Sequence, residues 1–163
     1  MLSPQALAEI ARERAKYPED RAQSALLAAL RIAQEDRGFL ATEVMDYVAH
    51  LLGVEPIRAY EVATFYSMYD LQPVGRHKIC VCGSVSCFLR GSDQILAHLE
   101  ERLGIQVGET TPDGLFTLRE VECLGACLGA PMMQVGDRYY ENLTKDRVDG
   151  ILAALREGGD DVG

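Results

Sequence analysis

The most informative stretch of the chain is HKICVCGSVSC, residues 77–87, which joins a short apolar strand to a loop with two cysteines. A similar arrangement follows in LFTLREVECLGAC, residues 115–127, where alternating apolar residues predict a second strand before two more cysteines. If the two strands are neighbours in one sheet, both loops open at the same edge. The thiols of Cys82, Cys87, Cys123 and Cys127 can then converge, which predicts a metal site.

The spacing of these cysteines favours a two-iron cluster over a single ion. Four residues separate Cys82 from Cys87 and three separate Cys123 from Cys127, whereas structural zinc is usually held by tighter C-x2-C pairs. A [2Fe-2S] cluster takes four thiolates, and wider loops suit its size. Small residues in both loops let backbone N–H groups approach sulfur. These residues are Gly83, Ser84, Ser86, Gly125, Ala126 and Gly129.

The fifth cysteine, Cys80, is expected to be an apolar core residue, because no second cysteine partners it. Five is an odd number of cysteines, and C-x-x-C is absent, so neither a disulfide framework nor a thioredoxin-type redox pair is predicted. The scattered histidines are expected to be ordinary surface or satisfied residues. They are His50, His77 and His98.

Three further residues lie near the predicted ligands in sequence. Glu120 and Glu122 are expected to be solvated strand residues, although a carboxylate close to a cluster would lower its reduction potential. With four thiolate ligands and a net charge of −9, a low potential is expected in any case. Pro131 is a candidate for a cis proline that supports the second ligand loop.

Outward from the cysteines, the chain reads as an α+β protein in two parts. Apolar residues at helical spacing predict helices over residues 4–17, 20–36 and 42–52 and another from Pro56, with Thr42 as the cap of the third. The period changes near residues 71–75, which places a boundary between a helical bundle, residues 1–72, and a cluster-bearing domain, residues 73–163. In the second part we expect a strand over 77–82, a helix over 92–103, a strand over 115–121 and a hairpin around Gly136-Asp137. A last helix follows Thr144, and the acidic, glycine-rich tail after it is expected to fray.

Composition narrows the class of partner. The 163 residues include 16 Lys and Arg against 25 Asp and Glu, and nucleic-acid binders usually carry a basic surface. No apolar run reaches the roughly 18 residues of a membrane-spanning helix. The first residues lack the basic and apolar regions of a signal peptide, so a reducing cytoplasm is the expected location.

Several segments resemble one family, the thioredoxin-like 2Fe-2S subunit of bacterial NADH:quinone oxidoreductase, respiratory complex I. These segments are VCGSVSC at 81–87 with Gly91 after it, ECLGAC at 122–127 with Ala130-Pro131, ATFYSMY at 63–69 and TPDGLF at 111–116. The resemblance spans about residues 18–155 and matches all four ligand positions, while Cys80 is not part of the family motif.

The resemblance implies a helical bundle followed by a thioredoxin-like domain with one [2Fe-2S] cluster. It also implies docking on the flavoprotein subunit that binds FMN and NADH, on the cytoplasmic side of the inner membrane and without direct membrane contact. In agreement, this chain has no nucleotide signature of its own, since Gly125-x3-Gly129 lacks the Lys-Ser/Thr of a phosphate loop. The chain is therefore expected to carry electrons without making or breaking bonds.

Other functions remain open at this point. The same module serves in NAD-linked hydrogenases and in NAD-dependent formate dehydrogenases. A free-standing thioredoxin-like ferredoxin would not need residues 1–70, and a structural zinc domain would be colourless and redox-silent. The aromatic segment at residues 63–69 is a candidate docking surface or, equally, a seam between the two parts.

Overall fold

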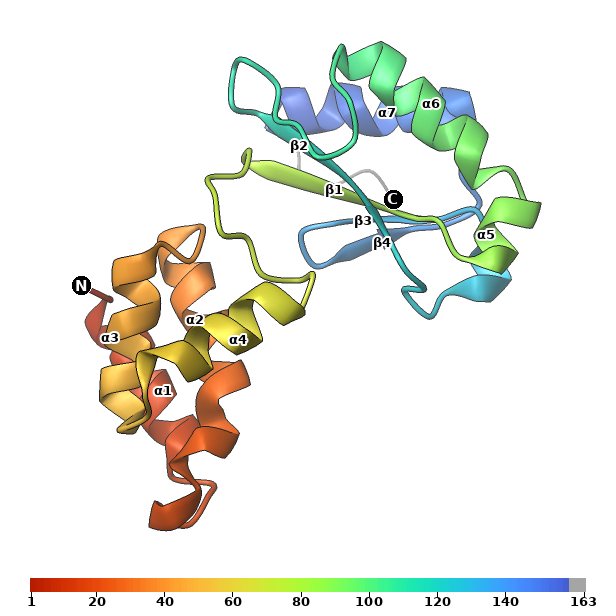
Figure 1. Ribbon diagram of the computed structural model, residues 1–163. Helices are drawn as coiled ribbons and strands as arrows, with labels where there is room; N and C mark the ends of the chain where they lie inside the picture. Colours follow the sequence, from red (N-terminus) through yellow and green to blue (C-terminus); the bar gives the residue numbers. More distant parts are fainter. Residues whose placement is uncertain (159–163) are drawn as a thin grey trace. The chain divides into compact units, whose positions relative to one another are not determined.

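A computed structural model describes residues 1–158, shown as a ribbon in Figure 1. The chain forms two compact units, Met1–Pro73 and Val74–Gly163. Each unit has its own hydrophobic core.

The first unit is a helical bundle of α1 (Pro4–Arg14), η1 (Glu19–Ala25), α2 (Leu26–Arg37), α3 (Thr42–Leu52) and α4 (Pro56–Phe65). The α1 helix begins as its sequence predicts: Pro4 is the first helical residue, and the Ser3 side chain accepts a hydrogen bond from the Ala6 N–H at 3.2 Å. The apolar stripes of the helices meet in one core, and its fully buried members include Ala29, Leu30, Ala33, Leu40 and Val48.

Two details of this bundle differ from the expectation. The helix predicted from residue 20 is a 3-10 turn as far as Ala25, because Arg21 has non-helical backbone angles and its N–H bonds the carbonyl of Pro18. Thr42 is the first residue of α3 rather than its cap. The cap position belongs to Ala41, whose side chain makes no capping hydrogen bond.

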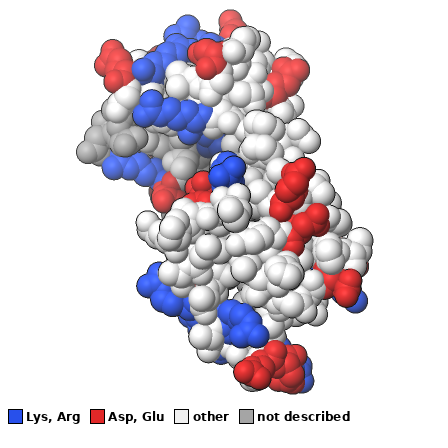
Figure 2. Space-filling view, turned by 90° about the vertical axis from the view of Figure 1, so that its left-hand side faces the viewer, with Lys and Arg blue, Asp and Glu red and all other residues white. Residues whose placement is uncertain are grey.

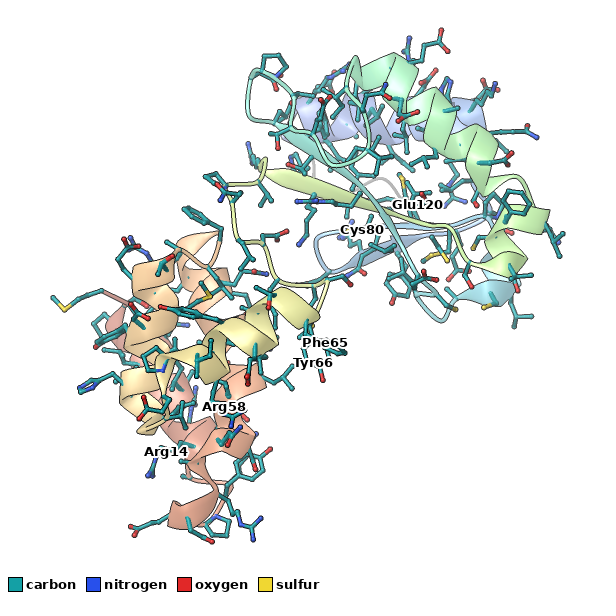
Figure 3. All side chains as sticks on the ribbon, in the orientation of Figure 1. Arg14, Arg58, Phe65, Tyr66, Cys80 and Glu120 are labelled. Carbon is teal, nitrogen blue, oxygen red and sulfur yellow. The ribbon has the colours of Figure 1, made fainter. Side chains whose placement is uncertain are left out.

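The segment after α4 is held against the bundle by hydrogen bonds. The hydroxyl of Tyr69 donates to the carbonyl of Leu27 at 2.8 Å, and the Leu40 N–H donates to the Asp70 carbonyl at 2.8 Å. Tyr69 is therefore a core residue of this unit, whereas Phe65, Tyr66 and Met68 are exposed. Figure 3 shows Phe65 and Tyr66 at the end of α4.

The second unit contains a four-stranded sheet in the order β2-β1-β3-β4. Strand β1 (His77–Cys82) pairs in parallel with β2 (Phe116–Val121) and antiparallel with β3 (Met133–Val135), which forms a hairpin with β4 (Arg138–Tyr140). Helices α6 (Ser92–Leu103) and α7 (Lys145–Arg156) lie side by side along the sheet in Figure 1. Their apolar faces cover Ile79, Val81 and Leu118.

The segments between the strands contain two elements that periodicity did not predict. Helix α5 (Val85–Leu89) follows β1 directly, and a 3-10 turn, η2 (Cys127–Gly129), follows the second cysteine pair. The bond between Ala130 and Pro131, the candidate named from the sequence, is cis. The tail expected to fray extends into residues 159–163, outside the described part of the chain. Within residues 1–158, no helix is long and apolar enough to cross a membrane.

Candidate metal centre

The parallel pairing of β1 and β2 brings the two cysteine loops together. Cys82, the last residue of β1, is the register partner of Val121, the last residue of β2. The Gly83 N–H donates to the Val121 carbonyl at 2.9 Å, so the two loops leave the sheet from adjacent points. Both loops therefore open at the same edge, as the sequence predicted.

All four predicted ligands lie in one cluster of thiols. The Sγ atoms of Cys123 and Cys127 are 3.6 Å apart, and Cys82 and Cys87 are hydrogen-bonded to each other. Cys127 is close enough to both Cys82 and Cys87 to act on them electrostatically. The first pair is buried and the second is exposed. The site is thus enclosed on the first loop's side and open on the second loop's side.

The pKa values of these thiols show how strongly they interact. Burial, together with the neighbouring Cys82, raises the pKa of Cys87 to about 11. The pKa of Cys127 is raised mainly by Cys123, whereas hydrogen bonding to the Gly125 N–H lowers the pKa of Cys123. Four thiolates this close need positive charge between them, which iron ions supply.

Hydrogen-bond donors surround the sulfurs from both loops. Backbone N–H groups of Gly125 and Met132 donate to Cys123 and Cys87 respectively. The hydroxyls of Ser84 and Ser86 also reach across from the first loop, to Cys123 and Cys127. The sequence predicted backbone donors from the small loop residues but not these hydroxyl contacts.

This donor set fits a [2Fe-2S] cluster. Such a cluster takes two protein ligands on each of its irons, and the thiols here are two pairs, each within one loop. A structural zinc site instead needs four donors around one ion.

The β3–β4 hairpin braces the second ligand loop. The hydroxyl of Tyr139 donates to the Leu124 carbonyl at 2.8 Å, and the Asn142 N–H donates to the Gly129 carbonyl at 2.6 Å. The Leu143 N–H donates to the Pro131 carbonyl at 2.9 Å. The loop is therefore fixed from both sides, by the sheet edge and by the hairpin.

Exposed apolar side chains lie next to one ligand cysteine of each loop. We call Val85, Phe88 and Leu89 of α5, together with Leu128, the apolar collar; all four are exposed, and Leu128 is fully so. Three of them lie within two residues of Cys87, and Leu128 directly follows Cys127. Exposed apolar groups in such density mark a contact surface for another protein.

The other residues singled out from the sequence are Cys80, three histidines and two glutamates, and the two glutamates lie near the ligand loops. Cys80 is half-buried and points away from the core that contains Ile79 and Val81, so its expected core role was wrong. His98 contacts Asp149 at 2.9 Å between α6 and α7, His77 packs on Phe116, and His50 is in the last turn of α3.

Glu122 acts electrostatically on Cys123, and Glu120 lies beside the first loop. Figure 3 labels Cys80 and Glu120 on their strands.

Charges on the surface are mixed. On the face drawn in Figure 2, Lys and Arg form small groups separated by uncharged residues and by Asp and Glu. The net charge of −9 agrees with this mixture, since nucleic-acid binders usually carry an excess of basic residues.

Known proteins resemble this chain over most of its length. A family model described as thioredoxin-like [2Fe-2S] ferredoxin matches residues 10–156. An NADH-quinone oxidoreductase subunit of Rhizobium meliloti (strain 1021) is 51% identical over 148 residues, covering 91% of this chain and 87% of that protein. An NADH-quinone oxidoreductase subunit of Rickettsia conorii (strain ATCC VR-613 / Malish 7) is 48% identical over 142 residues, covering 86% and 85% respectively.

A solved structure supports the fold independently. A chain of an NAD+-reducing [NiFe]-hydrogenase in the air-oxidized state superimposes with a TM-score of 0.72 at 23% identity. The match covers 82% of this chain but only 23% of the hydrogenase chain. At this identity the likeness concerns the fold alone.

Proposed function

Because the chain belongs to the thioredoxin-like [2Fe-2S] ferredoxin family, we propose that it holds one cluster through Cys82, Cys87, Cys123 and Cys127. In this proposal the chain serves as the electron-carrying [2Fe-2S] subunit of an NADH-quinone oxidoreductase. The observation that carries this proposal is the meeting of two cysteine pairs at one sheet edge. When bound, the cluster supplies one-electron transfer.

The chain's own residues hold and adjust this centre. The four thiolates bind, N–H and hydroxyl donors from both loops stabilise their negative charge, and the buried pair keeps water from one side. No covalent step is assigned to this chain. It contributes to an oxidoreductase by carrying electrons.

Sequence similarity favours the quinone-linked complex over a hydrogenase. Relatives at 51% and 48% identity, covering 91% and 86% of the chain, are named subunits of NADH-quinone oxidoreductase. The hydrogenase resemblance, at 23% identity, concerns the fold. The equivalent subunit of a hydrogenase or formate dehydrogenase remains the second candidate.

The partner we propose is the flavoprotein subunit, which would bind FMN and NADH. Short-range electron transfer requires the flavin to approach the centre from its open side, where Cys123 and Cys127 are exposed. The apolar collar lies next to Cys87 and Cys127 in the chain and would contact the partner there. In this assembly the chain would lie on the cytoplasmic side of the bacterial inner membrane and would contact no lipid itself.

We assign different roles to the two parts of the chain. Residues 73–163 form the cluster domain, and residues 1–72 serve as a docking domain. The exposed Phe65, Tyr66 and Met68 support a docking role for the first part, because large apolar side chains in one short segment favour contact with another protein. The edge-to-face packing of the Phe65 and Tyr66 rings presents them as one apolar surface.

An electron-transfer experiment tests this proposal. The full-length protein, purified anaerobically and reduced with dithionite, is mixed with one equivalent of the oxidised flavoprotein subunit of the same organism. We expect the electron paramagnetic resonance signal of the reduced cluster to disappear as the flavin takes up the electron. A reduced signal that persists beside oxidised flavin would contradict the proposed partnership.

A further inference from the structure

Each ligand loop contains a glycine whose α-carbon is covered by a glutamate side chain. Gly83 follows Cys82 directly, and a Cβ at this position would lie 3.0 Å from Cδ of Glu120 and overlap its carboxylate. Gly129 follows Cys127 by two residues, and a Cβ there would lie 2.5 Å from Cδ of Glu141. One carboxylate therefore lies directly on each loop.

The backbone fixes both glutamates in these places. Glu120 is in β2 as the register partner of Val81, one position before the paired ends of the two strands (Figure 3). Glu141 directly follows β4, where the next N–H, from Asn142, donates to the carbonyl of Gly129 at 2.6 Å. Arg147 also donates through Nη1 to the Glu141 carbonyl at 2.6 Å. Strand pairing and short hydrogen bonds thus fix the backbone from which each glutamate side chain covers its glycine.

Negative charge in these positions acts on the reduction of the centre. A [2Fe-2S] cluster gains one negative charge when it takes up an electron, and a nearby carboxylate opposes that gain. Glu141 is half-buried, so solvent and salt screen its charge less than that of the exposed Glu120.

We propose that Glu120 and Glu141 are potential-setting residues, whose carboxylates, one on each ligand loop, hold the reduction potential of the centre low. This inference rests on the proposed cluster and its four cysteine ligands. It adds Glu141, which lies outside the cysteine motif, to the groups that set the reduction potential of the centre.

Substitution by glutamine separates charge from shape. Glu120→Gln and Glu141→Gln keep the size of each side chain over its glycine and remove its charge. Glu101→Gln is the matched control, because Glu101 is an exposed glutamate near the end of α6 and belongs to neither ligand loop. All variants are full-length and cluster-loaded, and the readout is a redox titration followed by electron paramagnetic resonance.

We expect each substitution to raise the ratio of reduced to oxidised cluster about threefold to tenfold, at the potential where the native protein is half reduced. A tenfold change is a 59 mV rise in midpoint potential for a one-electron couple. The double variant should show the product of the two effects. Added salt should weaken the Glu120 effect more than the Glu141 effect, and the Glu101→Gln ratio should stay within the error of the native protein.

The outcomes separate this inference from the function on which it rests. Loaded Glu120→Gln and Glu141→Gln proteins whose midpoints match the control would overturn the inference and leave the cluster assignment standing. Absence of a [2Fe-2S] spectrum in the native protein would instead overturn the assignment itself. If Glu141→Gln does not retain the cluster, Glu141→Asp retains the charge and should keep the native midpoint; a raised midpoint in that variant would also contradict the inference.

Discussion

Cys82 and Val121 are register partners at the ends of the parallel strands β1 and β2. This single pairing places the first residue of one ligand loop beside the start of the other. Because parallel strands end at the same edge of a sheet, the two cysteine pairs meet there although α5 and α6 lie between the two strands in sequence. The metal centre is therefore a direct consequence of strand pairing.

The serine hydroxyls of the first loop are expected to raise the reduction potential. Ser84 donates to Cys123 and Ser86 to Cys127, and hydrogen bonds to sulfur stabilise the more negative, reduced state. Ser84→Ala and Ser86→Ala should each lower the midpoint by about 20 to 40 mV in a redox titration. Ser67→Ala, in the first unit, serves as the control, and a midpoint unchanged in both loop variants would rule out this role.

Gly129 is expected to tolerate no side chain. A Cβ there would lie 2.5 Å from Cδ and 2.6 Å from Cβ of Glu141, so Gly129→Ala should destabilise the protein by about 1–3 kcal/mol. Gly150→Ala is the opposite control: Gly150 is inside α7 with nothing within 4 Å of an added Cβ, and the change should stabilise by about 0.5–1 kcal/mol. Urea unfolding measures both, and equal effects of the two substitutions would contradict the packing described here.

Tyr69 is expected to stabilise the first unit through its hydroxyl. Tyr69→Phe removes the hydrogen bond to the Leu27 carbonyl and should lower the free energy of unfolding by about 1 kcal/mol, measured in urea at neutral pH. Tyr17→Phe is the control: Tyr17 is exposed, so its free energy of unfolding should stay that of the native protein. Loss of stability in the Tyr17 variant alone would contradict this assignment.

The same residue predicts a dependence on pH. Burial raises the pKa of Tyr69 to about 12 from an ordinary value of about 10. Because the folded state has the higher pKa, this stabilisation is complete below pH 10 and is lost as the pH rises toward 12. The advantage of the native protein over Tyr69→Phe should therefore shrink across this range, and an advantage that stays constant would contradict the assigned pKa.

The apolar collar is expected to bind the flavoprotein subunit. Phe88 and Leu128 are both exposed, one beside each cysteine pair. The double variant Phe88→Gln/Leu128→Gln should keep the cluster spectrum but bind the flavoprotein subunit about tenfold or more weakly, as measured by isothermal titration calorimetry. Val107→Gln is the control, because Val107 is an exposed apolar residue in the loop after α6. Equal affinity of all three proteins would place the docking surface elsewhere.

Much of the architecture could be predicted because it is encoded locally. Helical periodicity in residues 26–37 and 92–103, alternation in 77–82 and the turn at Gly136-Asp137 each depend on residues close in sequence, and the structure has these elements. The family and the α+β fold class were also predicted, and both are confirmed. The sequence predicted that the four thiols meet if the two strands are neighbours, and the structure pairs these strands.

What could not be predicted depends on contacts between distant residues. Glu141 reaches Gly129 only because the β3–β4 hairpin folds back on the second ligand loop, and Ser84 reaches Cys123 only across the strand pair. Helix α5 has five residues, too few to show a period. Cys80 was wrongly placed in the core because alternation tells which residues share a strand face but not which face is covered by helices.

The most direct test of the four-cysteine centre is the iron and acid-labile sulfide content of the anaerobically purified protein and its five single Cys→Ser variants. We predict two irons and two sulfides per chain in the native protein and in Cys80→Ser, and loss of both in Cys82→Ser, Cys87→Ser, Cys123→Ser and Cys127→Ser. One zinc per chain without sulfide would contradict the account. So would a cluster that needs Cys80 and survives the loss of one of the four.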